Sequence, residues 1–504
     1  MQEDVHIEQK RHLIRSLILL VYLVAQIYFA LHHEAWRDES QAWVLARNSS
    51  FAEILSLCAS EGHPCLWFFI LKFCQMLGVS FYALSGVSIS IMTVCAALFL
   101  WKSPFSLFSA VCVLLSPLFF YYNPVICRVY APLLLLIVLL CLYWPQRSSR
   151  PITYGVLTAL LLQSHVLVAG LGIGCILERI LYGKPRRDRK ALIGISLPIV
   201  SLVCMILELR QTGSTETFRH VSLSGILAQF DWRTALRNAA SVGRQLAPSR
   251  FLSNILLVLW LGMAAAFCVA LFRSRPFSKE TWGHGIVSVC AFSVYFGVIL
   301  FVRKAEHTQM ACVFLMLLLF FLWARDSFQT EGETKPGKTG SGWLAGVSPM
   351  EALFVLSCLI MIPKSAWLDP MADVNGPYSG SLEAVRIIEE NAPAEAVVAL
   401  HNDYLSTTIV SYLYESEKRY LLWDIDNGCE YTIHKWGRPN RYSFAPGQLY
   451  EAIREQLPNA QAVYYVEGSG KLHSSAYASE QMVPAGGNSV PNTWAEYYQI
   501  YRVD

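Results

Sequence analysis

The residues best suited to chemistry lie in one polar stretch that follows the first apolar run of the chain. The run covers about 13–31, and Trp-Arg-Asp-Glu-Ser-Gln-Ala-Trp follows at 36–43. Glu-Gly-His-Pro comes next, at 61–64. Charged side chains beside a membrane span are costly to place, so they are candidates for a functional site. Carboxylates such as Asp38 and Glu39 act as general bases, which take the proton from an attacking hydroxyl or amine.

The spacing around Asp38 also allows a structural interpretation. Asp38 followed by Gln41 predicts a capping box for a helix beginning near Glu39. Capping contributes about 1 kcal/mol, so an Asp could occupy this position for that reason alone. A capping carboxylate is also rigidly held, so capping and catalysis remain compatible.

Two further helices are expected in the same stretch. Ser50 followed by Glu53 predicts a capped helix over 51–59. Pro64 predicts the start of a third helix, over 65–76. This third helix is apolar but too short to cross a membrane, so we expect it to lie along the outer leaflet.

The composition of the chain indicates an all-α polytopic membrane protein. Hydrophobic residues make up 54% of it and charged residues 15%, with a mean hydropathy of +0.39. Soluble domains usually have about 25% charged residues. Runs near the ~20 apolar residues that a crossing needs predict eleven spans. We expect them at 13–31, 81–101, 105–122, 129–145, 151–164, 165–182, 191–209, 251–272, 283–302, 306–324 and 343–367.

Basic residues predict the orientation, because they are enriched in cytoplasmic loops. One side of the layout holds Lys10, Arg11, Lys102, Arg147, Arg150, the run 184–190, Arg273, Arg275 and Lys279. We therefore expect an integral, multi-pass protein of the plasma (inner) membrane with a cytoplasmic N-terminus. The stretches 32–80, 210–250 and 368–504 then lie outside. Loop 210–250 contains six arginines, which indicate either a surface facing solvent or lipid headgroups or a cover over an anionic ligand.

Two domains are expected. Residues 1–367 form the transmembrane domain, which ends after a flexible linker around 335–340. Residues 368–504 are polar and aromatic-rich, with helical spacing at 382–391 and short buried strands at 396–400 and 462–466. This alternation predicts a soluble extracytoplasmic α/β domain.

Several motifs, taken in order, resemble those of a known superfamily. The polar stretch 36–64 is followed by Tyr-Tyr-Asn at 121–123, Arg-Val-Tyr at 128–130 and Gln-Ser-His at 163–165. The series resembles the GT-C superfamily of polyprenyl-phosphate-sugar-dependent glycosyltransferases. The most similar branch looks like the bacterial protein mannosyltransferase and aminoarabinose transferase type. The resemblance covers about 1–325.

The resemblance implies a glycosyltransferase that works on the outer face by an inverting single displacement. Asp38 aligns with the general base. Its neighbour Glu39 orients the acceptor or, in some relatives, a divalent metal ion; no other cofactor is implied. The implied partners are a polyprenyl-phosphate sugar donor, a glycan, lipid or protein acceptor, and the lipid bilayer, with no nucleic acid.

The leaving phosphate needs cations to hold it. The candidate substrate-binding residues are those of the motifs, Glu61, His63, Arg128, Tyr130 and His165, together with the outward-facing cations Arg303 and Lys304. The aminoarabinose transferase type has a Lys where this chain has His63. Structural roles remain open for some of them: Arg303 and Lys304 as interfacial anchors, and His165 as a packing residue.

Two other functions remain open from the sequence. One is a lipid-linked oligosaccharide polymerase or ligase, and the polar helical stretch after the first span argues against it. The other is a transporter or flippase, which favours charges in the middle of spans, and few are found there. A transferase predicts that Asp38, His63, Arg128 and His165 line one outward cavity open to lipid.

Overall fold

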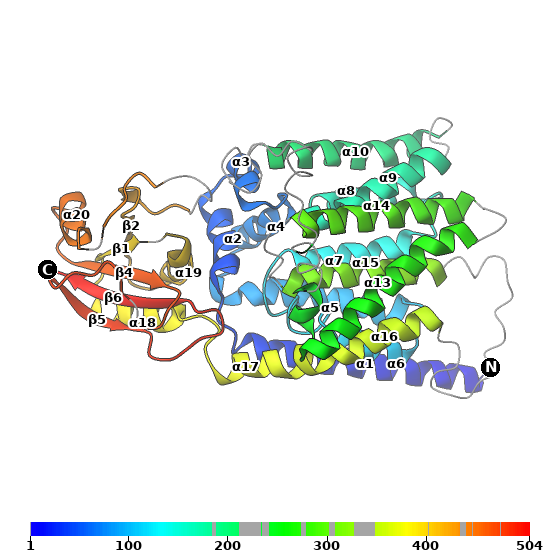
Figure 1. Cartoon of the computed structure of the whole chain (residues 1–504), viewed down its shortest axis with the longest axis horizontal. Helices are drawn as coiled ribbons and strands as arrows, with labels where there is room; N and C mark the ends of the chain where they lie inside the picture. The colour runs from blue at the N-terminus through cyan, green and yellow to red at the C-terminus, as the bar shows by residue number, and fades with distance from the viewer. Residues whose placement is uncertain are drawn as a thin grey trace.

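The chain forms a bundle of helices with a small mixed sheet packed on one end, as seen in a computed structural model (Figure 1). The structure describes residues 2–183, 188–210, 233, 241–273, 279–301, 308–326, 348–401, 403–433, 440–445, 447–473 and 475–504. The first helix begins at the end of the bundle far from the sheet (Figure 1).

Helices occur at all eleven positions where the sequence predicts a span. They are α1 (Gln2–Ala30), α5 (Leu84–Lys102), α6 (Leu107–Leu114), α7 (Tyr130–Tyr143), α8 (Pro151–Leu162), α9 (Ala169–Tyr182), α10 (Arg189–Arg210), α13 (Arg250–Arg273), α14 (Lys279–Phe301), α15 (Thr308–Asp326) and α16 (Pro349–Pro363). The predicted break at 163–165 is confirmed, since α8 ends there and the short helix η2 (Val166–Val168) precedes α9.

Within the described residues, five helices are long and apolar enough to cross a membrane: His6–Ala30, Phe81–Lys102, Arg189–Arg210, Arg250–Phe267 and Pro349–Asn375. The apolar helices Tyr130–Tyr143, Pro151–Leu162, Trp282–Val298 and Thr308–Ala324 are shorter. The five long helices support membrane association, whereas the full set of eleven crossings stays a prediction.

The predicted span 105–122 is wrong as a single helix. Helix α6 has eight residues, and eight residues extend about 12 Å, far less than a ~30 Å hydrocarbon core. The chain turns at Ser116, whose N–H bonds to the carbonyl of Val113 at 3.1 Å. Pro117 follows. A proline disfavours the helical backbone conformation for the residue before it, which is Ser116 here. Residues 115–129 are therefore mostly turns.

Three short helices follow α1: α2 (Arg37–Asn48), α3 (Phe51–Glu61) and α4 (Leu66–Met76), with η1 (Phe81–Ala83) before α5. The capping box of Ser50 and Glu53 is confirmed by bonds of 2.7 and 3.3 Å. The box predicted for Asp38 and Gln41 is wrong. Helix α2 begins at Arg37, so Asp38 lies inside its first turn.

The C-terminal part is the predicted α/β domain. Its sheet has the strand order β3-β2-β1-β4-β6-β5. Strand β1 (Val397–His401) is parallel to β2 (Leu421–Asp424) and β4 (Val463–Ser469). The antiparallel strands are β3 (Cys429–Glu430), β5 (Met482–Gly487) and β6 (Tyr497–Val503). The helices are α18 (Ser381–Asn391), α19 (Asp403–Leu413) and α20 (Leu449–Gln456).

Successive side chains of β1 point to opposite faces of the sheet. Val397 and Ala399 pack with Leu449 and Ile453 of α20, whereas Val398 and Leu400 join the main core of the molecule. Helix α19 lies against α2 on the bundle side, where the Tyr412 hydroxyl accepts the N–H of Ala35 at 3.1 Å. The sheet is therefore anchored directly on the stretch that contains Asp38.

Candidate active site

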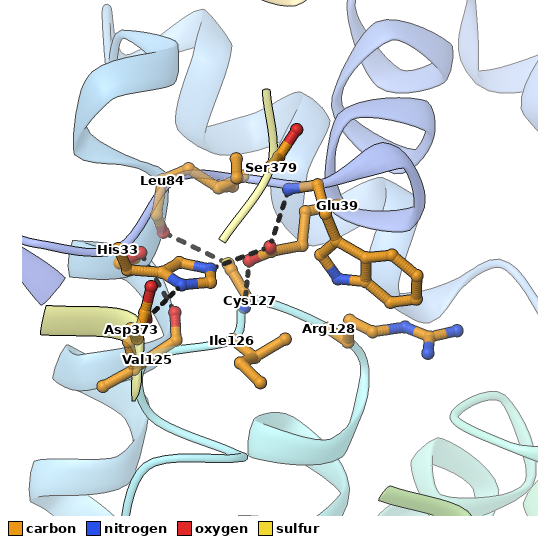
Figure 2. Close-up of polar contacts among 12 residues, drawn as sticks. His33, Glu39, Leu84, Val125, Ile126, Cys127, Arg128, Asp373 and Ser379 are labelled. Atoms are coloured by element: carbon orange, nitrogen blue, oxygen red, sulfur yellow. Dashed lines mark hydrogen bonds and ion pairs between the residues drawn. The ribbon is translucent and has the colours of Figure 1, made fainter. Parts of the chain in front are cut away.

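Glu39 is the buried centre of the site, because it accepts hydrogen bonds from three other groups. Its Oε2 accepts from the backbone N–H of Trp36 at 3.2 Å and lies 3.0 Å from Nε2 of His33. Its Oε1 accepts from the backbone N–H of Cys127 at 2.5 Å (Figure 2). This last bond holds the residue before Arg128 against α2.

His33 joins α2 to α17 (Asp369–Asn375), which continues α16. Its Nδ1 lies 2.8 Å from Oδ2 of Asp373 (Figure 2). The Tyr121 hydroxyl donates to the same oxygen at 2.8 Å. Burial opposes a charge on the imidazole, but the carboxylates of Glu39 and Asp373 outweigh it and raise the pKa of His33 to about 10. His33 is thus a buried cation between two carboxylates.

Asp38 forms the more accessible ion pair of the site. Its Oδ2 lies 3.2 Å from Nη2 of Arg128, and its Oδ1 accepts from Nε of Arg37 at 3.2 Å. Burial opposes the charge of Arg128, but the neighbouring Asp38 outweighs it and raises the pKa of Arg128. The Asp38 side chain is 17% exposed and that of Glu39 0%. Asp38 is therefore the carboxylate of the two that a ligand can reach.

A cavity of about 190 Å³ lies beside this pair, between the bundle and the C-terminal domain. Arg128 and Lys364 give it two cations. Lys364 Nζ lies 2.7 Å from both carboxylate oxygens of Asp369. One wall is the stacked pair of Trp36 and Trp494, with ring centroids 4.1 Å apart. The cavity thus combines charged and aromatic groups from both domains.

Irregular backbone positions both cations. Arg128 ends the turn-rich segment 115–129, and Gln309 holds that segment by donating to the carbonyl of Tyr122 at 2.6 Å. Lys364 opens a π-helical turn, Lys364–Leu368, after Pro363. Proline cannot donate a helical hydrogen bond, and single π-helical turns are frequent at functional sites. At membrane depth such backbone is tolerated only where it is buried in protein or lines a cavity.

The other predicted residues form a chain of contacts that leads from Arg128 deeper into the bundle. The guanidinium of Arg128 lies 5.6 Å from the ring centroid of Tyr130. The Tyr130 hydroxyl is 3.4 Å from Nε2 of His165, and the rings of His165 and His63 are 4.9 Å apart. Glu61 accepts from Nε2 of Gln41 at 2.8 Å. The structure therefore brings Tyr130, His165 and His63 into one series of contacts with Arg128, and it joins Glu61 to α2. Of the four residues expected to line one cavity, Arg128 lines it, whereas Asp38, His63 and His165 are not among its lining residues.

Two of the predicted regions lie outside the described residues. Arg303 and Lys304 belong to them, as does most of loop 210–250. No role for them is derived from the structure.

The sequence interpretation missed His33, Asp373, Lys364, Asp369 and Gln309. Lys364 and Asp369 border the end of the predicted span 343–367, and that position is a weak signal for the site. His33 and Asp373 are 340 positions apart. No local spacing relates them.

The donor set does not fit a divalent metal ion on Asp38 and Glu39. Asp38 is flanked by two guanidiniums, and Glu39 already accepts hydrogen bonds at both oxygens. Within the described part of the chain, no group of three or more His, Cys, Asp or Glu side chains is placed to hold a metal ion.

No family model matches the chain, and no curated protein matches it in sequence. The superfamily expected from the motifs therefore remains a prediction, based on the residues themselves.

Proposed function

We propose that this protein is a membrane glycosyltransferase, which moves a sugar from a polyprenyl-phosphate donor to an acceptor at the outer face of the membrane. The observation that supports it best is the Asp38–Arg128 ion pair, because Arg128 lines a cavity that also contains a second cation, Lys364. A base and a phosphate-binding pair are the two parts that this transfer requires. The resemblance of the motifs to the GT-C superfamily supports the same function.

In the proposed step, an acceptor oxygen attacks the anomeric carbon and forms the new glycosidic bond. The bond from that carbon to the phosphate oxygen breaks, and the lipid phosphate leaves with the electron pair. Asp38 takes the proton from the acceptor, while Arg128 and Lys364 bind the phosphate oxygens. Attack from the side opposite the leaving group inverts the configuration at the carbon.

Glu39 has a positioning role in this proposal. Its bonds to Trp36 and Cys127 fix the backbone on both sides of the Asp38–Arg128 pair. It is too enclosed to reach an acceptor, so the earlier expectation of an acceptor ligand is replaced by this indirect role.

The proposed membrane placement has eleven crossings, a cytoplasmic N-terminus and an outer C-terminal domain in the plasma (inner) membrane. The start of α1 and the sheet lie at opposite ends of the bundle, which supports it (Figure 1). Trp367 and Leu368, which are 64% and 51% exposed, project from the π-helical turn beside Lys364. Exposed aromatic side chains of this kind anchor proteins at a membrane interface. A lipid donor could then enter sideways at this level.

A transfer assay tests the proposal. Purified protein in detergent is supplied with a panel of polyprenyl-phosphate sugars and candidate acceptors, and the release of polyprenyl phosphate is measured by mass spectrometry. The expected result is release that depends on both acceptor and active protein. Movement of an intact donor across proteoliposome membranes, without release, would instead indicate the transporter alternative.

A further inference from the structure

The C-terminal sheet has a topological switch point at the carboxyl ends of β1 and β4. The chain leaves β1 through α19 to β2 on one side, and α20 brings it back to β4 on the other side. In open sheets of parallel strands, ligands bind outside the carboxyl ends at such a point. His401 is the last residue of β1 and is in register with Glu467 of β4.

The two ring nitrogens of His401 differ in their contacts. Its Nδ1 lies 2.7 Å from Oδ1 of Asp426. The side chain is 7% exposed, and Nε2 makes no hydrogen bond to the residues that the structure describes. An ionised carboxylate only accepts hydrogen bonds, so Nδ1 is the donor to Asp426, and Nε2 of the neutral imidazole is a hydrogen-bond acceptor. A buried polar atom without a partner is costly, and such atoms are rare in native structures.

Two aromatic rings lie beside the imidazole of His401. The ring of Tyr477 lies 4.3 Å from the imidazole, edge-on, and that of Phe444 lies 6.4 Å away. Glu467 fixes the segment that contains Tyr477: it accepts from Ser475 Oγ at 2.7 Å and from the N–H of Ala476 at 2.6 Å. Glu467 is thus a support for the aromatic wall and not a ligand group.

These features define the chemistry of a ligand. The acceptor Nε2 requires a donor, and a hydroxyl supplies one. Aromatic rings pack on the apolar face of a sugar ring and leave its hydroxyls at the edge. The carboxylates of Asp424, Asp426 and Glu467 at this edge disfavour an anion.

We propose that the carboxyl edge of this sheet binds an uncharged carbohydrate, which donates a hydroxyl to Nε2 of His401 and packs against Tyr477 and Phe444. The Tyr477 ring lies edge-on against the imidazole and would turn aside when the sugar enters. This inference goes beyond the proposed function, because it involves neither Asp38 nor Arg128.

Histidine footprinting of the full-length protein in detergent tests the proposal without any transfer assay. Diethyl pyrocarbonate modifies neutral imidazole nitrogens, and mass spectrometry measures each site. The probes are methyl glycosides of glucose, galactose, mannose and N-acetylglucosamine and their disaccharides. A bound sugar at about nine times its dissociation constant should slow the modification of His401 about tenfold. His473, an exposed histidine of the same domain, is the internal control and should be unaffected.

A variant supplies a second readout. His401→Leu keeps a similar volume and removes both nitrogens, so the saturation-transfer NMR signal of the protecting sugar should disappear. His473→Gln should leave that signal unchanged. The proposal is overturned if none of the sugars protects His401, or if the signal persists at full strength in His401→Leu. It is also overturned if His401 reacts only after Tyr477→Ala and no sugar then protects it, because Tyr477 would be its packing partner alone.

Discussion

Replacing His33 by glutamine should destabilise the protein by about 3–5 kcal/mol at pH 7, the range for breaking a buried ion pair. His33 lies 3.0 Å from Glu39 and 2.8 Å from Asp373, and the side chains of all three are 0–1% exposed. Glutamine removes the cation and leaves two buried carboxylates facing one side chain. The double variant His33→Gln/Asp373→Asn removes one of these carboxylates and should recover part of the loss.

The same cluster predicts how stability depends on pH. The pKa of His33 is raised from 6.5 to about 10 in the folded protein. The folded state therefore binds more protons than the unfolded state between these values. The stabilisation is fully present below about pH 6.5 and is lost as the pH rises through about 10. At about 1.36 kcal/mol per pH unit, the upper bound of this loss is about 5 kcal/mol.

Thermal unfolding in detergent, measured from about pH 6 to pH 10, checks both statements. The matched control is His32→Gln, since His32 is exposed just after α1 and its Nδ1 bonds to the carbonyl of Tyr28 at 2.8 Å. Wild type and His32→Gln should lose stability together as the pH rises. His33→Gln should start lower and change less. If His33→Gln unfolds like the control over the whole pH range, the buried cation does not contribute to the free energy of unfolding and the reasoning is refuted.

Three further predictions concern the cavity, the domain junction and the topology. The Arg128 guanidinium contacts Asp38 through Nη2 and donates from Nη1 to Oε1 of Gln309 at 3.4 Å. Arg128→Lys keeps the charge but cannot make both contacts, so donor use should fall about tenfold to a hundredfold, the equivalent of roughly 1.5–3 kcal/mol; an unchanged donor titration would make Arg128 structural. Burial raises the pKa of Glu496 to about 7, so the protein should lose stability as the pH rises from about 4.5 to about 7. Glu496→Gln should reduce the loss of stability between about pH 4.5 and pH 7. Part of the loss should remain, because the pKa of Glu34 is also raised to about 7. An unchanged slope of stability against pH would count against the raised pKa of Glu496. Cys429 is exposed in the C-terminal domain, so an impermeant maleimide should label it from outside intact cells. The Cys429→Ser variant should lose this labelling. Labelling only after lysis would contradict the proposed placement of the domain outside the membrane.

Local patterns were enough to predict many elements of the fold. The cap of Ser50 and Glu53, the break near His165 and the strands β1 and β4 depend on neighbouring residues, and the structure has them all. The single helix expected over 105–122 is wrong, because a prediction from hydrophobicity alone leaves out the effect of Pro117 on the backbone of the residue before it. The predicted start of α2 was also wrong. The spacing of Asp38 and Gln41 indicated a cap at Asp38, whereas in the structure Glu39 accepts the backbone N–H of Trp36, the residue before the helix.

The site was only partly accessible from sequence. Asp38 and Arg128 belong to short motifs with recognisable residue types, and the structure pairs them. Lys364 and Asp369 come from the far end of the chain and meet the site through α17. The burial of Glu39 also depends on distant partners, His33 and Cys127, which close over it only in the folded protein. Such long-range contacts leave no periodicity or spacing that a single sequence displays.

Asp38→Asn in the transfer assay tests the central claim most directly. Asparagine keeps the size of the side chain but cannot take a proton, so polyprenyl phosphate release should disappear. Its amide NH₂ group cannot accept a hydrogen bond, so one of the two arginine contacts of Asp38 is lost and the unfolding temperature should fall while the protein stays folded. Glu53→Gln is the matched control, because Glu53 caps α3 in the same stretch between α1 and α5, and it should retain release. Near-normal release by a folded Asp38→Asn protein would contradict the account.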